Sequence, residues 1–131
     1  MGVGNASNIR IAHWSAPTAA HVASHGNTDD ATENGAYCLA IAAIEQELGL
    51  FFISRAERKT GADIYADADP FAQDMETAHR VEVSGIDLGG IAAIRERLRR
   101  KLLQLGAVPS SNPEIAVVVG FEEATILVRK A

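Results

Sequence analysis

Residues 80–86 of the chain read Arg-Val-Glu-Val-Ser-Gly-Ile, and the other elements of the sequence can be arranged around this stretch. Side chains alternate between the two faces of a β-strand. We therefore expect Val81 and Val83 on an apolar face, and Glu82 and Ser84 side by side on the opposite, polar face. A polar face of this kind is typical either of a functional site or of a sheet surface that contacts water.

The size and charge of the chain restrict its class. With 131 residues, of which 47% are hydrophobic, the chain is long enough for one domain with a single core. We interpret residues 1–29 as an N-terminal arm with a short strand at Ile9–Ala12, and residues 30–131 as one α/β domain. The formal charge of −5 excludes a global positive field that would attract nucleic acid or an anionic membrane.

The longest apolar run, Ala36–Ile44, is far shorter than the roughly 20 residues that cross a bilayer. The chain also starts without the basic and apolar segments of a secretory signal. We therefore expect a cytoplasmic protein with no membrane partner. The single cysteine, Cys38, lies within the apolar run, which predicts a buried thiol in a reducing compartment.

The apolar run belongs to a predicted helix that ends at Gly49. Asp30 or Thr32 can cap its amino end, and Glu33 in the first turn suits the positive end of the helix dipole. A helix without a polar face is buried on more than one side. We expect this helix to pack on a sheet, or to contact a second subunit as well, which favours a homodimer.

Two strands are predicted after this helix. A strand from Leu50 to about Glu57 and a strand at Ala62–Ala66 flank the turn Lys59–Gly61 and form a hairpin. Propensity disfavours an aspartate in a strand. Asp63 is therefore either a turn residue or a residue placed there for chemistry.

A second helix and two strands complete the chain after residue 86. The helix covers Ile91–Leu105 and has an apolar stripe. Its other side carries the one concentrated group of positive residues, which consists of Arg95, Arg97, Arg99, Arg100 and Lys101. Such a group indicates either the solvated face of a helix or a contact for phosphates. Glu114–Gly120 is apolar on both faces, as expected of a central strand, and Thr125–Val128 is a closing strand.

The predicted order from residue 31 onward is helix, three strands, helix and two strands, which fits a mixed sheet flanked by helices. This order, with Glu33 on the first helix, Gly61-x-Asp63 opening the second strand and Glu82-Val83-Ser84 on the third, resembles the PD-(D/E)XK restriction-endonuclease-like superfamily. The resemblance covers about residues 30–131 and leaves the N-terminal arm unmatched. It implies a nuclease-like α/β domain with nucleic acid as its partner and Mg²⁺ as its cofactor.

The resemblance also assigns roles to individual residues. Asp63 and Glu82 would hold Mg²⁺, and Glu33 would be an accessory catalytic residue. Ser84 occupies the position of the catalytic lysine, and a hydroxyl cannot carry the positive charge that this lysine brings to the reaction. A cation from elsewhere would have to replace it, and the candidates are Lys101, an arginine of the second helix, Arg80 and Lys59.

Two functions of different classes follow, and the sequence leaves both open. The first is Mg²⁺-dependent hydrolysis of a phosphodiester in nucleic acid, with Arg95, Arg99 and Lys101 in contact with phosphates. The second is a non-catalytic binding or assembly module of the same fold, which forms a homodimer. A third interpretation is an unrelated α/β domain, because one fold hosts many activities.

Overall fold

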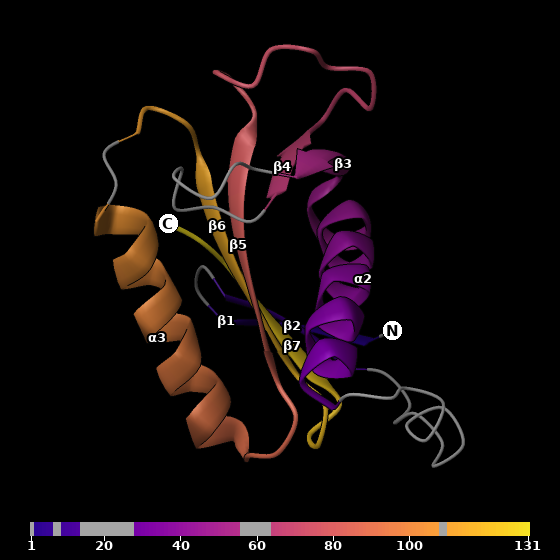
Figure 1. The fold of residues 1–131 in the computed structure, drawn as a ribbon, viewed down its shortest axis with the longest axis vertical. Coiled ribbons are helices and arrows are strands. Elements are labelled where there is room, and N and C mark those ends of the chain that lie inside the picture. Colours follow the sequence, from indigo (N-terminus) through magenta and orange to yellow (C-terminus); the bar gives the residue numbers. More distant parts are fainter. Residues whose placement is uncertain (1, 7–8, 14–27, 56–63, 108–109) are drawn as a thin grey trace.

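The computed structural model describes residues 2–6, 9–13, 28–55, 64–107 and 110–131. Their elements are β1 (Gly2–Ala6), β2 (Ile9–His13), α2 (Thr28–Leu48), β3 (Phe51–Arg55), β4 (Ile64–Asp67), β5 (His79–Ile86), α3 (Ile91–Ala107), β6 (Glu114–Gly120) and β7 (Thr125–Lys130). From residue 28 onward the order is helix, three strands, helix and two strands. The predicted fold class, a mixed sheet flanked by helices, is confirmed (Figure 1).

The strands form one seven-stranded sheet in the order β1-β2-β7-β6-β5-β4-β3. Of the described pairs, β5 and β6 are parallel and all others are antiparallel. Two parallel neighbours need a crossover, and α3 supplies it. The segment 1–29, for which the sequence predicts an arm, holds β1 and β2, and β2 pairs with β7 along its whole length.

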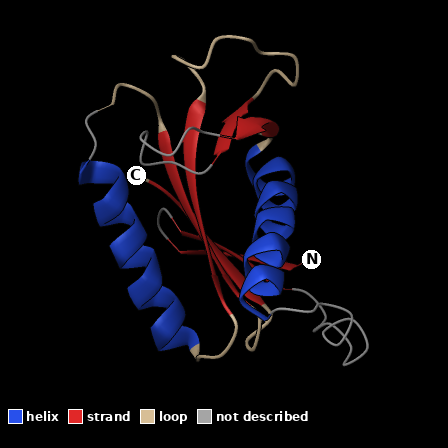
Figure 2. Cartoon of the chain, in the orientation of Figure 1, coloured by secondary structure: helices blue, strands red, loops and turns tan. Residues whose placement is uncertain are grey.

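The helices cover opposite faces of the sheet, α2 on one side and α3 on the other (Figure 2). The central strand β6 serves both layers because successive side chains point to opposite faces. Ile115, Val117 and Val119 pack in the cluster under α2, whereas Ala116 and Val118 pack in the cluster under α3. Burial on both faces explains why the residues of β6 between Glu114 and Gly120 are all apolar.

Helix α2 differs from the sequence prediction in two ways. It begins at Thr28, earlier than the predicted cap. The prediction of a buried Cys38 thiol is wrong, because Cys38 is exposed. The helix packs on the sheet through another side, which includes the buried Ala36 and Ala40.

Helix α2 ends close to the predicted position. Gly49 follows the last helical residue with a φ of 66°, a left-handed conformation that glycine adopts without strain. Strand β3 then starts at Phe51, and the predicted turn Lys59–Gly61 lies outside the described residues. No helix in the described part of the chain is long and apolar enough to cross a membrane.

The contact between β6 and α3 leads to a first prediction. A Cβ atom added at Gly120 would collide with the side chain of Ile94, whose Cγ1 would be 2.8 Å away. Ile94 is fully buried and has little room to move. We expect Gly120→Val to lower the free energy of unfolding by about 2–3 kcal/mol, measured by denaturant titration.

Gly106 provides the matched control, because it lies within α3 and an added Cβ would meet no atom within 4 Å. Gly106→Ala should raise the free energy of unfolding by about 0.5 kcal/mol, since alanine favours a helix over glycine. An unchanged stability in Gly120→Val would contradict the close packing of α3 on β6.

Candidate binding site at the open edge of β5

Strand β5 extends past Ile64, the first described residue of its neighbour β4, which pairs with Val81. Their pairing covers His79 to Val81 on β5, and no described residue of β4 pairs with β5 beyond Val81. On the other side, Arg80 N–H donates to the Pro113 carbonyl and Phe121 N–H donates to the Ile86 carbonyl. Alternate residues of a strand turn their backbone groups to opposite neighbours. The N–H and C=O of Gly85 therefore face the open edge.

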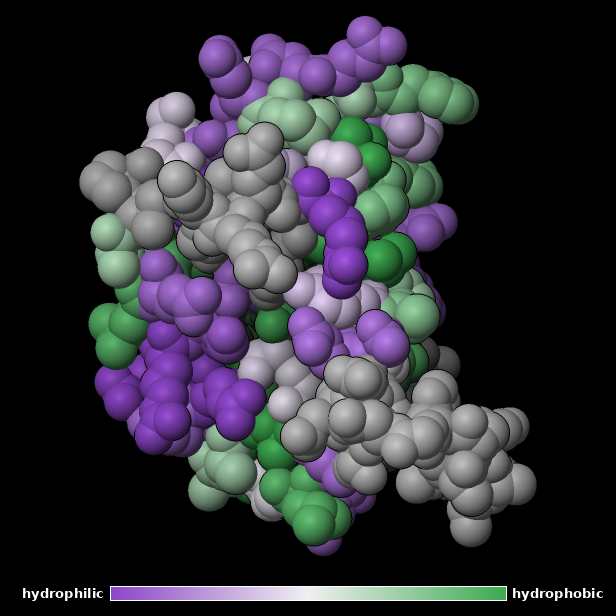
Figure 3. All heavy atoms as spheres, in the orientation of Figure 1, coloured by the Kyte–Doolittle hydropathy of each residue, from purple (hydrophilic) through white to green (hydrophobic). Residues whose placement is uncertain are grey.

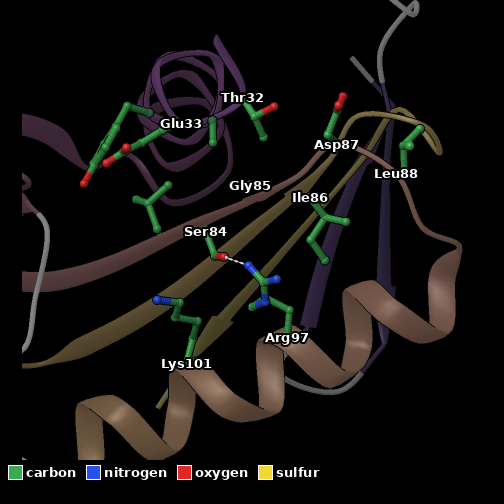
Figure 4. A pocket seen from close by; sticks show the side chains of 12 residues that line it. Thr32, Glu33, Ser84, Gly85, Ile86, Asp87, Leu88, Arg97 and Lys101 are labelled. Atoms are coloured by element: carbon green, nitrogen blue, oxygen red, sulfur yellow. Dashed lines mark hydrogen bonds between the residues drawn. The ribbon is translucent and has the colours of Figure 1, made fainter. Parts of the chain in front are cut away.

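A pocket of about 470 Å³ lies along this edge. In Figure 4, Thr32 and Glu33 project from α2 on one side of β5, and Arg97 and Lys101 project from α3 on the other side. Gly85 lies between the two groups and contributes to the lining. The pocket therefore joins residues from both faces of the sheet around the edge of one strand.

The lack of a side chain at Gly85 lets α2 approach β5 closely. A Cβ atom at this position would be 3.0 Å from the Cβ of Ala36 and 3.0 Å from the backbone oxygen of Thr32. Contacts of this length are tighter than most real Cβ contacts, so a side chain at position 85 would require α2 to move slightly away. Glycine at position 85 therefore sets the distance of the α2 wall from the strand.

The polar face of β5 is buried under α3, which corrects one expectation. Glu82 is 2% exposed, so this face is not a sheet surface that contacts water. One carboxylate oxygen of Glu82 accepts a hydrogen bond from Lys101 Nζ at 3.0 Å and another from Gln104 Nε2 at 2.8 Å. The acid of the Glu-x-Ser unit thus forms an ion pair with the helix that covers it.

Ser84 is bonded to the same helix. Its hydroxyl oxygen accepts a hydrogen bond from a guanidinium nitrogen of Arg97 at 2.6 Å (Figure 4). Arg97 is half-buried and lines the pocket, and none of the ion pairs among the described residues includes it. Its charge is therefore not neutralised within the described chain, whereas the charge of Lys101 is offset by Glu82.

The predicted phosphate-contacting residues do not share one surface. Successive residues of an α-helix are about 100° apart, so Arg95 and Arg99 lie about 200° around the axis from Arg97 and Lys101, respectively. Figure 3 shows hydrophilic side chains gathered over the outer side of α3. Arg99 is paired there with Glu96 at 2.7 Å, and its hydrogen bond lowers the pKa of Glu96 to about 2.

The acids that the resemblance assigns to a metal are not brought together by the described residues. Glu33 lines the pocket from α2, Glu82 is buried under α3, and Asp63 lies outside the described residues. No three histidine, cysteine or acidic side chains in the described part are close enough to hold a metal ion. With Glu82 already bonded to Lys101 and Gln104, the described residues alone do not fit Mg²⁺.

Arg80, a candidate for the missing cation, has another partner. One of its guanidinium nitrogens lies 3.5 Å from a carboxylate oxygen of Glu114, at the start of β6. Arg80 is 2% exposed and therefore belongs to the interior of the domain. Among the candidate cations that the structure describes, Lys101 is the one that contacts Glu82.

Sequence reasoning missed Arg97, Gln104 and Gly85 as members of the site. It included Arg97 in the positive group of the second helix without singling it out. The spacing held a signal, because Arg97, Lys101 and Gln104 recur at intervals of four and three residues and so share one flank of α3. The contribution of Gly85 depends on which residues pair with β5 beyond Val81, which the sequence does not define closely.

The buried ion pair leads to a second prediction. Lys101→Met removes the ammonium beside Glu82, whose side chain is 3% exposed, and leaves a buried carboxylate without this cation. We expect the free energy of unfolding at neutral pH to fall by about 3 kcal/mol. The double variant Glu82→Gln/Lys101→Met should recover most of this loss in denaturant titrations.

Arg100→Met is the control for this prediction, because Arg100 is exposed on the same helix and pairs with the exposed Glu96. Its effect should stay below about 0.5 kcal/mol. A Lys101→Met variant as stable as Arg100→Met would show that the ion pair with Glu82 does not hold α3 on the sheet.

No family model, curated protein or solved structure matches the chain. The resemblance to the PD-(D/E)XK superfamily therefore stays a prediction from the residues and the element order. What the structure adds is a pocket at the open edge of β5, with one cation whose charge no described residue neutralises.

Proposed function

We propose that the chain is a non-catalytic binding module that holds a phosphate group of a nucleic acid at the open edge of β5. The observation that carries this proposal is the position of Arg97, whose guanidinium lines the pocket, is oriented by Ser84 and forms no ion pair with a described residue. Guanidinium groups suit phosphates because their donors form a planar fork.

Two neighbouring groups support an anion beside Arg97. The backbone N–H of Gly85 faces the same edge, where no described strand pairs with it, and such a backbone donor can bond a phosphate oxygen. Lys101 lines the pocket one helical turn further along α3. Its ion pair with Glu82 keeps its ammonium in a fixed position.

The state of Glu82 favours binding over hydrolysis. A metal-dependent nuclease needs carboxylates that are free to ligate the ion. Here the carboxylate of Glu82 accepts hydrogen bonds from an ammonium and an amide of the covering helix, so it stabilises the packing of α3. Ser84 likewise orients Arg97 in place of supplying a catalytic charge.

The proposal predicts that a short single-stranded oligonucleotide binds in a manner that depends on Arg97. Arg97→Gln should weaken binding by about tenfold, because a hydrogen-bonded charge is lost. The slope of log affinity against log salt concentration should become shallower by about 1, which corresponds to one phosphate contact. Fluorescence anisotropy at several salt concentrations measures both quantities.

Arg95→Gln is the matched control, since Arg95 is exposed on the opposite flank of the same helix and carries the same charge. It should change the affinity less than Arg97→Gln does. An equal or larger loss in Arg95→Gln would place the nucleic acid on the outer side of α3 and contradict the pocket as the binding site.

Mg²⁺-dependent hydrolysis of a phosphodiester is the second candidate, and one observation favours it. The ammonium of Lys101 lies 3.0 Å from a carboxylate oxygen of Glu82. It could take the role of the catalytic lysine whose position Ser84 occupies. In this candidate Asp63 and Glu82 would hold the metal, with Glu33 in an accessory role. A hydrolytic site would then require Glu82 to exchange its bond to Lys101 for a metal.

A metal titration separates the two candidates. We expect calorimetry with Mg²⁺ or Mn²⁺ to show no binding that depends on Glu82, and we expect no cleavage of single- or double-stranded nucleic acid. Binding that is abolished by both Asp63→Asn and Glu82→Gln, together with cleavage, would instead establish the hydrolytic candidate.

The homodimer remains part of the proposed module. It was predicted from a helix without a polar face, and the outward positions Cys38 and Ala42 of α2 are exposed in the single chain. These small, weakly polar side chains are compatible with close packing against a second copy. The sheet-facing side of α2 is already covered and does not require one.

A further inference from the structure

The two walls of the pocket differ in charge. Arg97 and Lys101 line it from α3, whereas Glu33 lines it from α2 on the other side of β5, and Asp87 adds a second carboxylate just after β5 (Figure 4). Glu33 is exposed, and among the described residues it has no hydrogen-bond or ion-pair partner. A carboxylate repels an anion but accepts hydrogen bonds. A ligand that spans the pocket therefore needs an anionic end towards α3 and hydrogen-bond donors towards α2.

The pocket is also larger than a phosphate group requires. Its volume of about 470 Å³ lies in the range of sites for small organic ligands. Ala36, Val83 and the ring of Tyr37 contribute apolar surface to its lining. The Arg55 guanidinium carbon lies 4.8 Å from the centre of the Tyr37 ring, a cation–π contact that restrains this ring.

Apolar surface and an aromatic ring suit a nucleobase. Contacts between a base and an aromatic side chain are worth about 1–3 kcal/mol and tolerate different bases. The amino groups of bases and the hydroxyls of sugars are the donors that a carboxylate such as Glu33 accepts. The phosphate of a nucleotide thus suits the α3 wall and its base suits the α2 wall. The sugar would lie between them, at the strand edge.

From these features we infer that the pocket binds a single nucleoside monophosphate unit, with its phosphate at Arg97 and its base between Tyr37 and Glu33. This inference rests on the proposed function, because it uses the same phosphate contact. It adds that the site binds one nucleotide including its base, either as a free nucleotide or as the terminal nucleotide of a strand. The site would not bind several successive phosphates of one strand.

The test compares three ligands by calorimetry on the full chain: adenosine 5′-monophosphate, inorganic phosphate and ribose 5-phosphate. The parent protein should bind the nucleotide about tenfold more tightly than either of the other two, since only the nucleotide carries a base. Arg97→Gln should weaken the binding of all three ligands, because each has the phosphate.

Glu33→Gln is the decisive variant, because it removes the negative charge at nearly unchanged size. We expect it to bind inorganic phosphate more tightly than the parent does, while its preference for the nucleotide over phosphate falls severalfold. Glu45→Gln, an exposed acid on the same helix outside the pocket, should leave both affinities unchanged. Circular dichroism verifies that each variant is folded.

The outcomes separate this inference from the proposed function. Equal affinities for the nucleotide, ribose 5-phosphate and phosphate, all weakened by Arg97→Gln, would overturn the nucleotide site and leave phosphate binding intact. Nucleotide binding that Arg97→Gln does not weaken would overturn both. With the nucleotide bound as expected, tighter binding of a 5′-phosphorylated than of an unphosphorylated oligonucleotide supports a strand end as the source, and equal binding supports a free nucleotide.

Discussion

The position of β5 between the flanks of α2 and α3 is the constraint on which the pocket depends. Two helices on opposite faces of a sheet are normally separated by the full thickness of the sheet. Among the described residues, β4 pairs with the first residues of β5 only. Beyond them, residues on the flanks of α2 and α3 line one pocket around β5, among them Glu33, Arg97 and, on the strand itself, Gly85.

Buried polar contacts fix the helix that forms one wall of this space. The contact of α3 with the sheet includes buried apolar residues such as Ile94 and Leu98, whose packing has no fixed direction. Hydrogen bonds are directional, and those from Lys101 and Gln104 to Glu82 define one position of the helix along β5. Arg97 is then aligned with Ser84. The same strand face that resembles a catalytic unit thus positions the cation of the proposed binding site.

Local patterns predicted the fold well where a single physical rule applies. The alternation in residues 80–86 identified the two faces of β5, and the unbroken apolar run of β6 identified a strand covered on both sides. The order of elements from the first helix onward followed from these strands and from the turn and cap residues between them. The prediction of a buried Cys38 was wrong because hydrophobicity alone does not state which side of an apolar helix meets the sheet.

The site was less predictable because its residues are brought together by tertiary structure. Arg97 and Arg99 are identical in type and two positions apart, but a rotation of about 200° sends one to the pocket and the other to a surface pair with Glu96. No composition rule separates them. In the sequence, only the apolar stripe through Ile94 and Leu98 indicates which side of the helix faces the sheet. The residues that contact the two flanks of the helix depend on which strand it packs against.

The electrostatics of the site explain how an acidic chain could select an anion. A net charge of −5 opposes the approach of nucleic acid, but at physiological salt this field is screened beyond about 8 Å. Inside the pocket, the nearest charges decide: Arg97 would attract a phosphate, Lys101 is largely offset by Glu82, and the carboxylates of Glu33 and Asp87 would repel an anion. One uncompensated cation beside two carboxylates favours a ligand with a single phosphate over a polyanion. The opposing charges therefore limit how much anion the pocket accepts, and the apolar lining between them has to supply the remaining affinity.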